Sequence, residues 1–203
     1  MAFTLSEKII GIVSALYVVF YSFVFFQSLN YEFIAYIGVL LFFFFLITLT
    51  IRKTNFSPSI LSGLSFWGFL HLSGGGIHID GATLYSQELI HFFGKGESFI
   101  LKYDQAVHFW GFFITTFVIY HLFKNAFGEN AKRPLVYITA GLASMGLGVV
   151  NELVEFGAFL AIEKTGVGGF FNLSLDLVFN TLGVVIAVAL LFFLQGNRYK
   201  ERG

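Results

Sequence analysis

Two carboxylates, Glu152 and Glu155, interrupt the end of an otherwise apolar run, in the stretch NELVEFGAF. Residues three apart lie near one face of a helix, so both acids point in similar directions. A charge near the centre of a membrane helix costs roughly 2.5–3.5 kcal/mol on insertion scales. Two such charges need partners, and ionisable groups inside a membrane are functional candidates for that reason.

Partners are found on the segments that precede and follow this one. The stretch DQAVHFWGFFITT places Asp104 and His108 four residues apart, and DLVFNTLG places Asp176 and Asn180 at the same spacing. Both read D-x3-(H/N)-x2-G, which keeps the polar groups on one helical face. In all three segments a carboxylate lies seven residues, or about 10 Å, from a glycine. We expect the carboxylates to share one level, above a zone where small residues let the helices pack tightly.

Imidazole nitrogen and carboxylate oxygen together suit Zn, Mn or Fe, or Mg with more water. His108, Glu152 and Asp176, one from each helix, form the predicted metal site, with open positions for water. A metal-free alternative uses a His–carboxylate pair as a general base or a proton relay. The predicted catalytic cluster contains the following residues: Asp104, His108, Glu152, Glu155, Asp176 and Asn180.

Structural explanations compete with this interpretation for single residues. Asp104 and Asp176 lie in or near the first turns of their helices, where an acid favours the helix dipole by roughly 0.3–1 kcal/mol. Asn180 alone is typical of an interhelical hydrogen bond. Glu152 lies toward the C-terminal end of its helix, where the dipole disfavours an acid, and it is the hardest to explain by packing alone.

The segment LHLSGGGIHIDGATLY adds polar groups beside this cluster. His71, His78 and Asp80 are predicted substrate-binding residues, on the same side of the membrane as the cluster. The glycines at 74–76 are expected to end the preceding helix and to let the chain bend back or form a flexible turn. No HExxH, GxSxG or CxxC motif and no phosphate-binding glycine fingerprint is present.

Composition predicts the class of protein. Of 203 residues, 57% are hydrophobic and 12% are charged, about half the charged content of an ordinary soluble domain. Apolar runs of about 20 residues indicate transmembrane helices. We therefore predict an all-α polytopic membrane protein with about six transmembrane helices in a single domain, residues 1–203. Two helices fall in 1–57 and a four-helix unit with an outer loop, 74–103, falls in 58–195. The expected spans are Ile9–Gln27, Glu32–Ile51, Pro58–Ser73, Asp104–Lys124, Pro134–Phe159 and Asn172–Gln195.

The basic residues predict the orientation in the cell membrane. With the N-terminus inside, nine of the 12 Lys and Arg residues lie in cytoplasmic segments, and Lys95, Lys102 and Lys164 lie outside. Cytoplasmic loops are enriched in Lys and Arg, so both termini are predicted to be cytoplasmic. The polar cluster then lies in the outer leaflet.

The same residues carry a resemblance to known families. YDQAVHFWGFF, NELVEF and LDLVFNTLGVVIA resemble the VanZ-like membrane proteins, and LHLSGGG followed by LY resembles the YjdF-type bacterial inner-membrane family more closely. The resemblance covers residues 67–190. GGFFNLSLD replaces an acidic, glycine-containing segment of the YjdF-type pattern, and the Gln that commonly follows the VanZ-like Glu is absent. VanZ-like members are associated with glycopeptide resistance, but the resemblance implies no settled reaction. It marks His108, Glu152, Glu155, Asp176, Asn180 and Gly183 as site residues.

Three functions remain open at this point. The first is a membrane enzyme, acting on a lipid or lipid-linked head group at the outer leaflet and assisted by a divalent metal. The second is a proton- or cation-coupled transporter or lipid translocator, which the apolar inner halves of the last three helices disfavour. The third is a scaffold subunit whose polar cluster only locks helices together. Membrane lipids are the expected partners, and no basic patch suggests nucleic acid.

Overall fold

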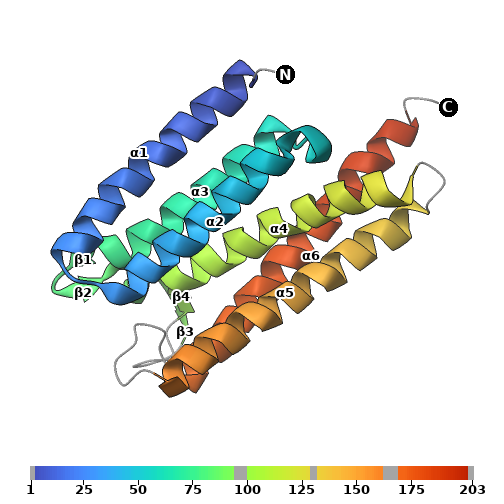
Figure 1. The fold of residues 1–203 in the computed structure, drawn as a ribbon. Helices are drawn as coiled ribbons and strands as arrows, with labels where there is room; N and C mark the ends of the chain where they lie inside the picture. Colours follow the sequence, from blue (N-terminus) through green and yellow to red (C-terminus); the bar gives the residue numbers. More distant parts are fainter. Residues whose placement is uncertain (1–2, 94–99, 129–131, 162–168, 201–203) are drawn as a thin grey trace. The chain divides into compact units, whose positions relative to one another are not determined.

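The structure is a computed structural model that describes residues 3–93, 100–128, 132–161 and 169–200. Six α-helices follow one another along the chain, with short strands between the third and the fourth (Figure 1). The helices are α1 (Leu5–Gln27), α2 (Tyr31–Thr54), α3 (Pro58–Gly76), α4 (Tyr103–Phe127), α5 (Arg133–Ala161) and α6 (Phe170–Lys200). The connection from α3 to α4 contains β1 (His78–Ile79), β2 (Ala82–Thr83), the 3-10 turn η1 (Leu84–Ser86), β3 (Glu88–Phe93) and β4 (Ile100–Lys102).

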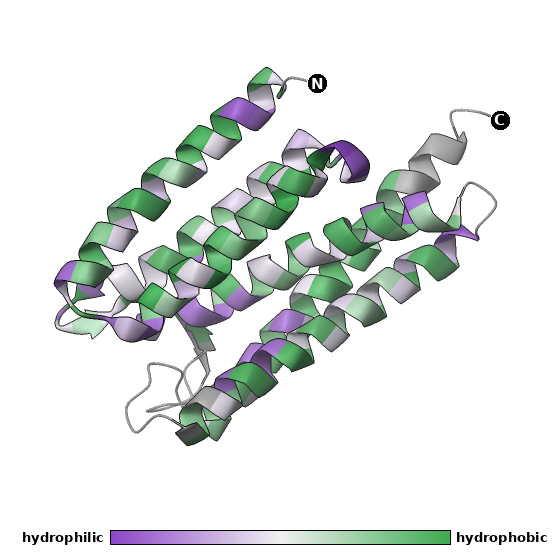
Figure 2. Ribbon diagram, viewed as in Figure 1, coloured by the Kyte–Doolittle hydropathy of each residue, from purple (hydrophilic) through white to green (hydrophobic). Residues whose placement is uncertain are grey.

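The predicted all-α class is confirmed, and so is the location of the six helices. Five of them are long and apolar enough to cross a membrane, namely α1, α2, α4, α5 and α6. Apolar residues cover most of their length (Figure 2). With 19 residues, α3 is the shortest of the six and is not among these candidate spans. The count of six transmembrane segments, the cytoplasmic termini and the single-domain division therefore stay predictions.

Capping residues define the first three helix starts. Thr4 and Glu7 form a reciprocal capping box at α1, in which each side chain accepts a hydrogen bond from the other's backbone N–H. Asn30 and Ser57 each accept from the backbone N–H three residues later and begin α2 and α3. Pro58 is the first residue of α3, as predicted, because a first-turn N–H has no intrahelical partner to lose.

The predicted end of the third helix at Ser73 is wrong. The glycines at 74–76 are helical, and α3 continues through all three of them. A Cβ atom on each would collide with an aromatic ring, and the rings come from three elements: Tyr21 of α1, Phe33 of α2 and Tyr85 of η1. The glycines therefore serve close ring packing inside the helix and do not form a turn.

The helices and strands divide into two compact units, and the boundary falls within α4 after Val107. The first unit holds α1 to α3 and the start of α4. Its core joins α1, α2 and α3 through the following buried side chains: Tyr17, Val18, Tyr21, Phe25, Phe33, Ile37 and Leu72.

The second unit contains the rest of α4 together with α5 and α6. The three helices alternate in direction, so the first turns of α4 and α6 and the last turns of α5 lie at the same end (Figure 1). Ser144 of α5 donates a hydrogen bond to the carbonyl oxygen of Phe112 in α4, at 3.3 Å. The pairing of Gly141 with Val184 and Val188 brings α5 and α6 into close contact.

Candidate functional site

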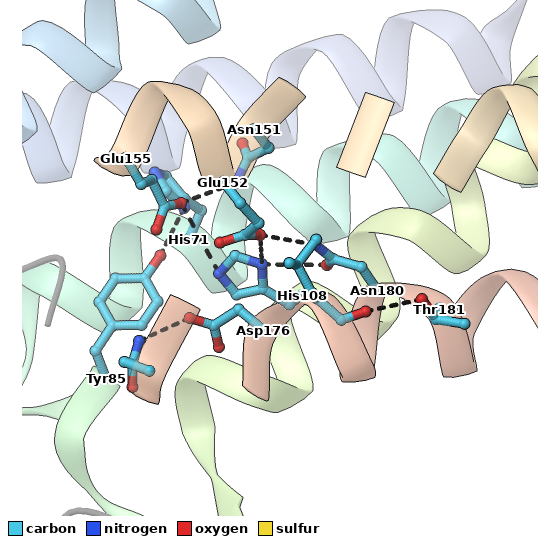
Figure 3. A network of polar contacts seen from close by, with 11 residues as sticks. His71, Tyr85, His108, Asn151, Glu152, Glu155, Asp176, Asn180 and Thr181 are labelled. Carbon is cyan, nitrogen blue, oxygen red and sulfur yellow. Dashed lines mark hydrogen bonds and ion pairs between the residues drawn. The ribbon is translucent and has the colours of Figure 1, made fainter. Parts of the chain in front are cut away.

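Polar side chains of the second unit meet near the common end of its three helices. His108 comes from the second turn of α4, Glu152 and Glu155 from the last third of α5, and Asn180 from the third turn of α6. Figure 3 shows these side chains turned toward one another between the helices. The face predicted from the three- and four-residue spacings is therefore the face that the helices share.

A triangle of contacts forms the centre of the site. Asn180 donates through Nδ2 to Oε1 of Glu152 at 2.7 Å. Nδ1 of His108 lies 3.2 Å from Oδ1 of Asn180 and 3.3 Å from the same Oε1 of Glu152 (Figure 3). Glu152 and Asn180 are 4% and 2% exposed, so these contacts form almost entirely away from solvent.

These three contacts indicate which ring nitrogen of His108 carries a hydrogen. An ionised carboxylate only accepts hydrogen bonds, so Asn180 must turn its NH2 group toward Glu152 and its oxygen toward His108. Nδ1 of His108 then faces two acceptors and must carry the hydrogen. The other ring nitrogen, Nε2, is directed at Glu155, whose Oε1 lies 4.0 Å away. That separation is too long for a direct hydrogen bond, so a group bound beside both atoms could bridge them.

Two further carboxylates are also held by asparagines. Asn151 donates to Oε1 of Glu155 at 2.8 Å, and Asn172 donates to Oδ2 of Asp176 at 2.6 Å. In both pairs the asparagine lies four residues before the acid on the same helix, where side chains meet. Asn151 and Asn172 are not among the residues predicted for the site. The patterns N-x3-E and N-x3-D were the signal that would have indicated them.

Glu152 has one oxygen that the protein does not satisfy. Its Oε2 is buried and accepts no hydrogen bond from any residue that the structure describes. A buried carboxylate oxygen without a donor costs free energy comparable to a lost hydrogen bond or more. Such an atom in a native protein calls for a water, a proton or a cation.

Small residues pack the helices closely beside the site, as predicted. A Cβ atom on Gly183 of α6 would collide with the carbonyl oxygen of Phe109 in α4 and would lie 3.0 Å from the N of Phe113. A Cβ on Gly148 of α5 would lie 3.4 Å from the side chain of Asn180. The backbones of α4 and α6 therefore touch one turn beyond the polar cluster.

Atoms that could ligate a metal gather around His108. One ligand atom each from His108, Glu152 and Glu155 lies within 4.8 Å of the other two. The ligand set predicted from the sequence, His108, Glu152 and Asp176, stays a prediction. Asp176 is fully buried and remains a neighbour, because it also offers an oxygen within 4.8 Å of a ring nitrogen of His108.

The remaining predicted residues belong to the first unit. Asp104 lies one turn before His108 on α4. Nδ1 of His71 and the hydroxyl of Tyr85 form a hydrogen bond of 2.5 Å. His78 in β1 and Asp80, in the turn that joins β1 to β2, are exposed. The catalytic role predicted for Asp104 and the substrate-binding role predicted for His71, His78 and Asp80 stay predictions.

Asn180→Leu is expected to lower the free energy of unfolding by about 1–3 kcal/mol. Leucine has a similar shape but leaves Oε1 of Glu152 and Nδ1 of His108 without the amide that joins them. Thermal unfolding in detergent measures the change. Asn125→Leu is the matched control, since Asn125 is exposed near the other end of α4. Equal unfolding midpoints for the two variants would show that the contacts of Asn180 with Glu152 and His108 do not stabilise the fold.

The chain matches a known protein family over most of its length. The family model described as "Predicted membrane protein (DUF2238)" matches residues 9–197, nearly the whole chain. The chain belongs to this family. No curated protein and no solved structure matches the chain. The DUF2238 match, with the five apolar helices, makes the chain an integral membrane protein with several membrane-crossing helices.

Proposed function

We propose that this DUF2238 protein is a membrane-embedded enzyme that acts on the head group of a lipid or lipid-linked substrate in the outer leaflet. The observation that carries the proposal is the orientation of His108. Nδ1 is held by Asn180 and Glu152, so Nε2 faces Glu155 across 4.0 Å. A water or a substrate hydroxyl between Nε2 and Glu155 is the group that the site would activate.

The depth of the site suits a lipid head group. His108 lies five residues, or about 8 Å, from the start of α4, and Glu152 lies nine residues, or about 14 Å, from the end of α5. The hydrocarbon core of a bilayer is about 30 Å thick. The candidate membrane spans of α4 and α5 end at Tyr103 and Gly157, about 8 Å from His108 and from Glu152, and each span is about 38 Å long. The reactive atoms would thus lie a few ångströms inside the hydrocarbon boundary of one leaflet, within reach of the ester groups of a lipid. The distribution of Lys and Arg favours the outer leaflet.

The resemblance to the VanZ-like and YjdF-type proteins supports the same residues. It marks His108, Glu152 and Asn180, which form the triangle, together with Glu155, which faces it. We propose that the chain shares its site with those families.

Transport is disfavoured by what lies beyond the site. The hydroxyls of Thr116 and Ser144 both donate to the carbonyl oxygen of Phe112, at 2.7 and 3.3 Å. Gly183 brings α6 against the backbone of α4 at about the same level. A proton or cation pathway would need further polar groups at this level. The hydroxyls of Thr116 and Ser144 already donate their hydrogens to a backbone carbonyl oxygen, so they are poorly suited to carry a proton or a cation.

A scaffold role is disfavoured by the unsatisfied oxygen. A cluster that only locks helices together gains most when every buried polar atom is paired. Oε2 of Glu152 has no donor within the described part of the chain. An incomplete network at a buried acid is typical of a site that binds something else.

A reconstituted system tests the proposal. The purified protein is placed in vesicles of phosphatidylethanolamine, phosphatidylglycerol and cardiolipin, and each lipid is followed by mass spectrometry. We expect one lipid class to be converted, and at least about 100-fold more slowly by Glu155→Gln. Glu88→Gln in β3, an exposed acid outside the site, serves as the control.

Either of two results would contradict the proposal. Conversion by Glu155→Gln at the wild-type rate would remove the site from the chemistry. If the wild type converts none of these lipids and instead moves protons into the vesicles in a His108-dependent way, transport takes the place of catalysis.

A further inference from the structure

We infer that the site binds one divalent metal ion, held by Nε2 of His108 and by carboxylate oxygens of Glu155 and Glu152. The inference rests on the residues of the proposed active site and adds a ligand that the proposed reaction does not by itself require. Four independent features of the second unit lead to it.

The first feature is the spacing of the donor atoms. Zinc lies about 2.0–2.2 Å from imidazole nitrogen and carboxylate oxygen, so two donors on one ion are roughly 3–4 Å apart. Nε2 of His108 and Oε1 of Glu155 are 4.0 Å apart, and one ring nitrogen of His108 lies within 4.8 Å of a carboxylate oxygen of Glu152 and of Glu155. Small side-chain movements would bring all three donors to one ion.

The second feature is the state of the histidine ring. A metal-ligating histidine almost always donates its other N–H to a carboxylate or carbonyl group, which fixes the tautomer and the ring orientation. Nδ1 of His108 faces the amide oxygen of Asn180 at 3.2 Å and a carboxylate oxygen of Glu152 at 3.3 Å. In the neutral ring the lone pair is then on Nε2, the nitrogen that faces Glu155.

The third feature is the second carboxylate oxygen of Glu152. Glu152 is 4% exposed, and Oε2 finds no hydrogen-bond donor in the described residues. Figure 3 shows this carboxylate turned toward His108. A metal ion at Nε2 would supply the positive charge that this oxygen lacks.

The fourth feature is the charge of the surroundings. Three carboxylates accept hydrogen bonds from asparagines, which carry no charge. A lipid phosphate, itself an anion, would be repelled by such a site. A divalent ion would remove this repulsion and would lower the pKa of a bound water.

The donor set indicates which ions to test. One imidazole and two carboxylates suit Zn²⁺ or Mn²⁺ better than Ca²⁺, which prefers six to eight oxygens. We therefore use Zn²⁺ and Mn²⁺ as probes.

Elemental mass spectrometry provides the first measurement. The full chain is purified in detergent with an affinity tag that contains no histidine. We expect close to one equivalent of metal in the wild type and in His121→Ala, and less than a tenth of that in His108→Ala. His121 is the matched control, because it lies on the same helix, 13 residues farther along.

Titration of chelator-treated protein with Zn²⁺ or Mn²⁺ separates binding from folding. Asn180→Leu keeps all three ligands and removes only the group that orients His108, so we expect its metal affinity to fall 10–100-fold. The thermal unfolding midpoint should rise with metal in the wild type and not in Glu155→Gln.

The outcomes distinguish this inference from the proposed function. Absence of metal from wild type, or equal metal in wild type and His108→Ala, overturns the inference. Lipid conversion by a wild type that takes up neither Zn²⁺ nor Mn²⁺ in the titration also overturns it and leaves the proposed function standing. Stoichiometric, His108-dependent metal without conversion of any lipid supports the metal site and counts against the enzyme.

Discussion

Gly183→Ala is expected to cost about 3 kcal/mol of stability, the upper part of the range for overpacked cores. The added methyl group would collide with the carbonyl oxygen of Phe109 and press on the N of Phe113. These are backbone atoms, so no side chain can turn aside, and α4 and α6 must separate. For a chain of this size the thermal unfolding midpoint should fall by roughly 6–12 °C.

Gly146→Ala on α5 is the matched control for this prediction. A Cβ atom there meets nothing within 4 Å. Alanine in a helix interior is more favourable than glycine by roughly 0.5–1 kcal/mol, so the midpoint should stay constant or rise. A similar midpoint for both variants would show that α4 and α6 do not touch at Gly183.

His108→Ala is expected to slow lipid conversion by at least about 100-fold and up to about 10⁴-fold, the range for loss of a positioned acid–base group. The change removes the only imidazole in contact with Glu152 and Asn180 among the described residues, while Asn180 still holds Glu152 at 2.7 Å. The fold should therefore persist. Rates are measured in vesicles, and thermal unfolding is measured on the same preparation.

The unfolding measurement separates the enzyme from the scaffold. A scaffold cluster predicts that His108→Ala unfolds the protein, because its polar contacts would serve only stability. If the protein is an enzyme, His108→Ala should stay folded and convert lipid more slowly. His121→Ala, which changes a histidine in contact with Asn125 at the other end of α4, should alter neither quantity.

Hydrophobicity alone located the helices well. The predicted start and end of α2 lie within three residues of the observed ones, because an apolar run and its flanking polar residues are both local signals. The end of α3 could not be predicted in the same way. The glycines at 74–76 would end an isolated helix, but the rings of Phe33 and Tyr85 pack against them here. Contacts of that kind join residues far apart in the sequence.

The sequence predicts which helix faces carry the site residues, but it does not predict which of their atoms are in contact. Helical spacing placed His108, Glu152 and Asn180 on facing sides of three helices, and the structure brings them together. Which acid approaches Nε2 depends on the rotation of α5 about its axis and on side-chain rotamers. Spacing does not report these, so the approach of Glu155 to Nε2 of His108 could not be predicted.

The rate of lipid conversion in vesicles by wild type, His108→Ala and His121→Ala, at equal amounts of folded protein, shows whether the site takes part in the reaction. We expect conversion by the wild type and by His121→Ala, and a loss of at least about 100-fold in His108→Ala. Equal rates for all three proteins would contradict the proposed function, because the residue at the centre of the site would then have no part in the reaction.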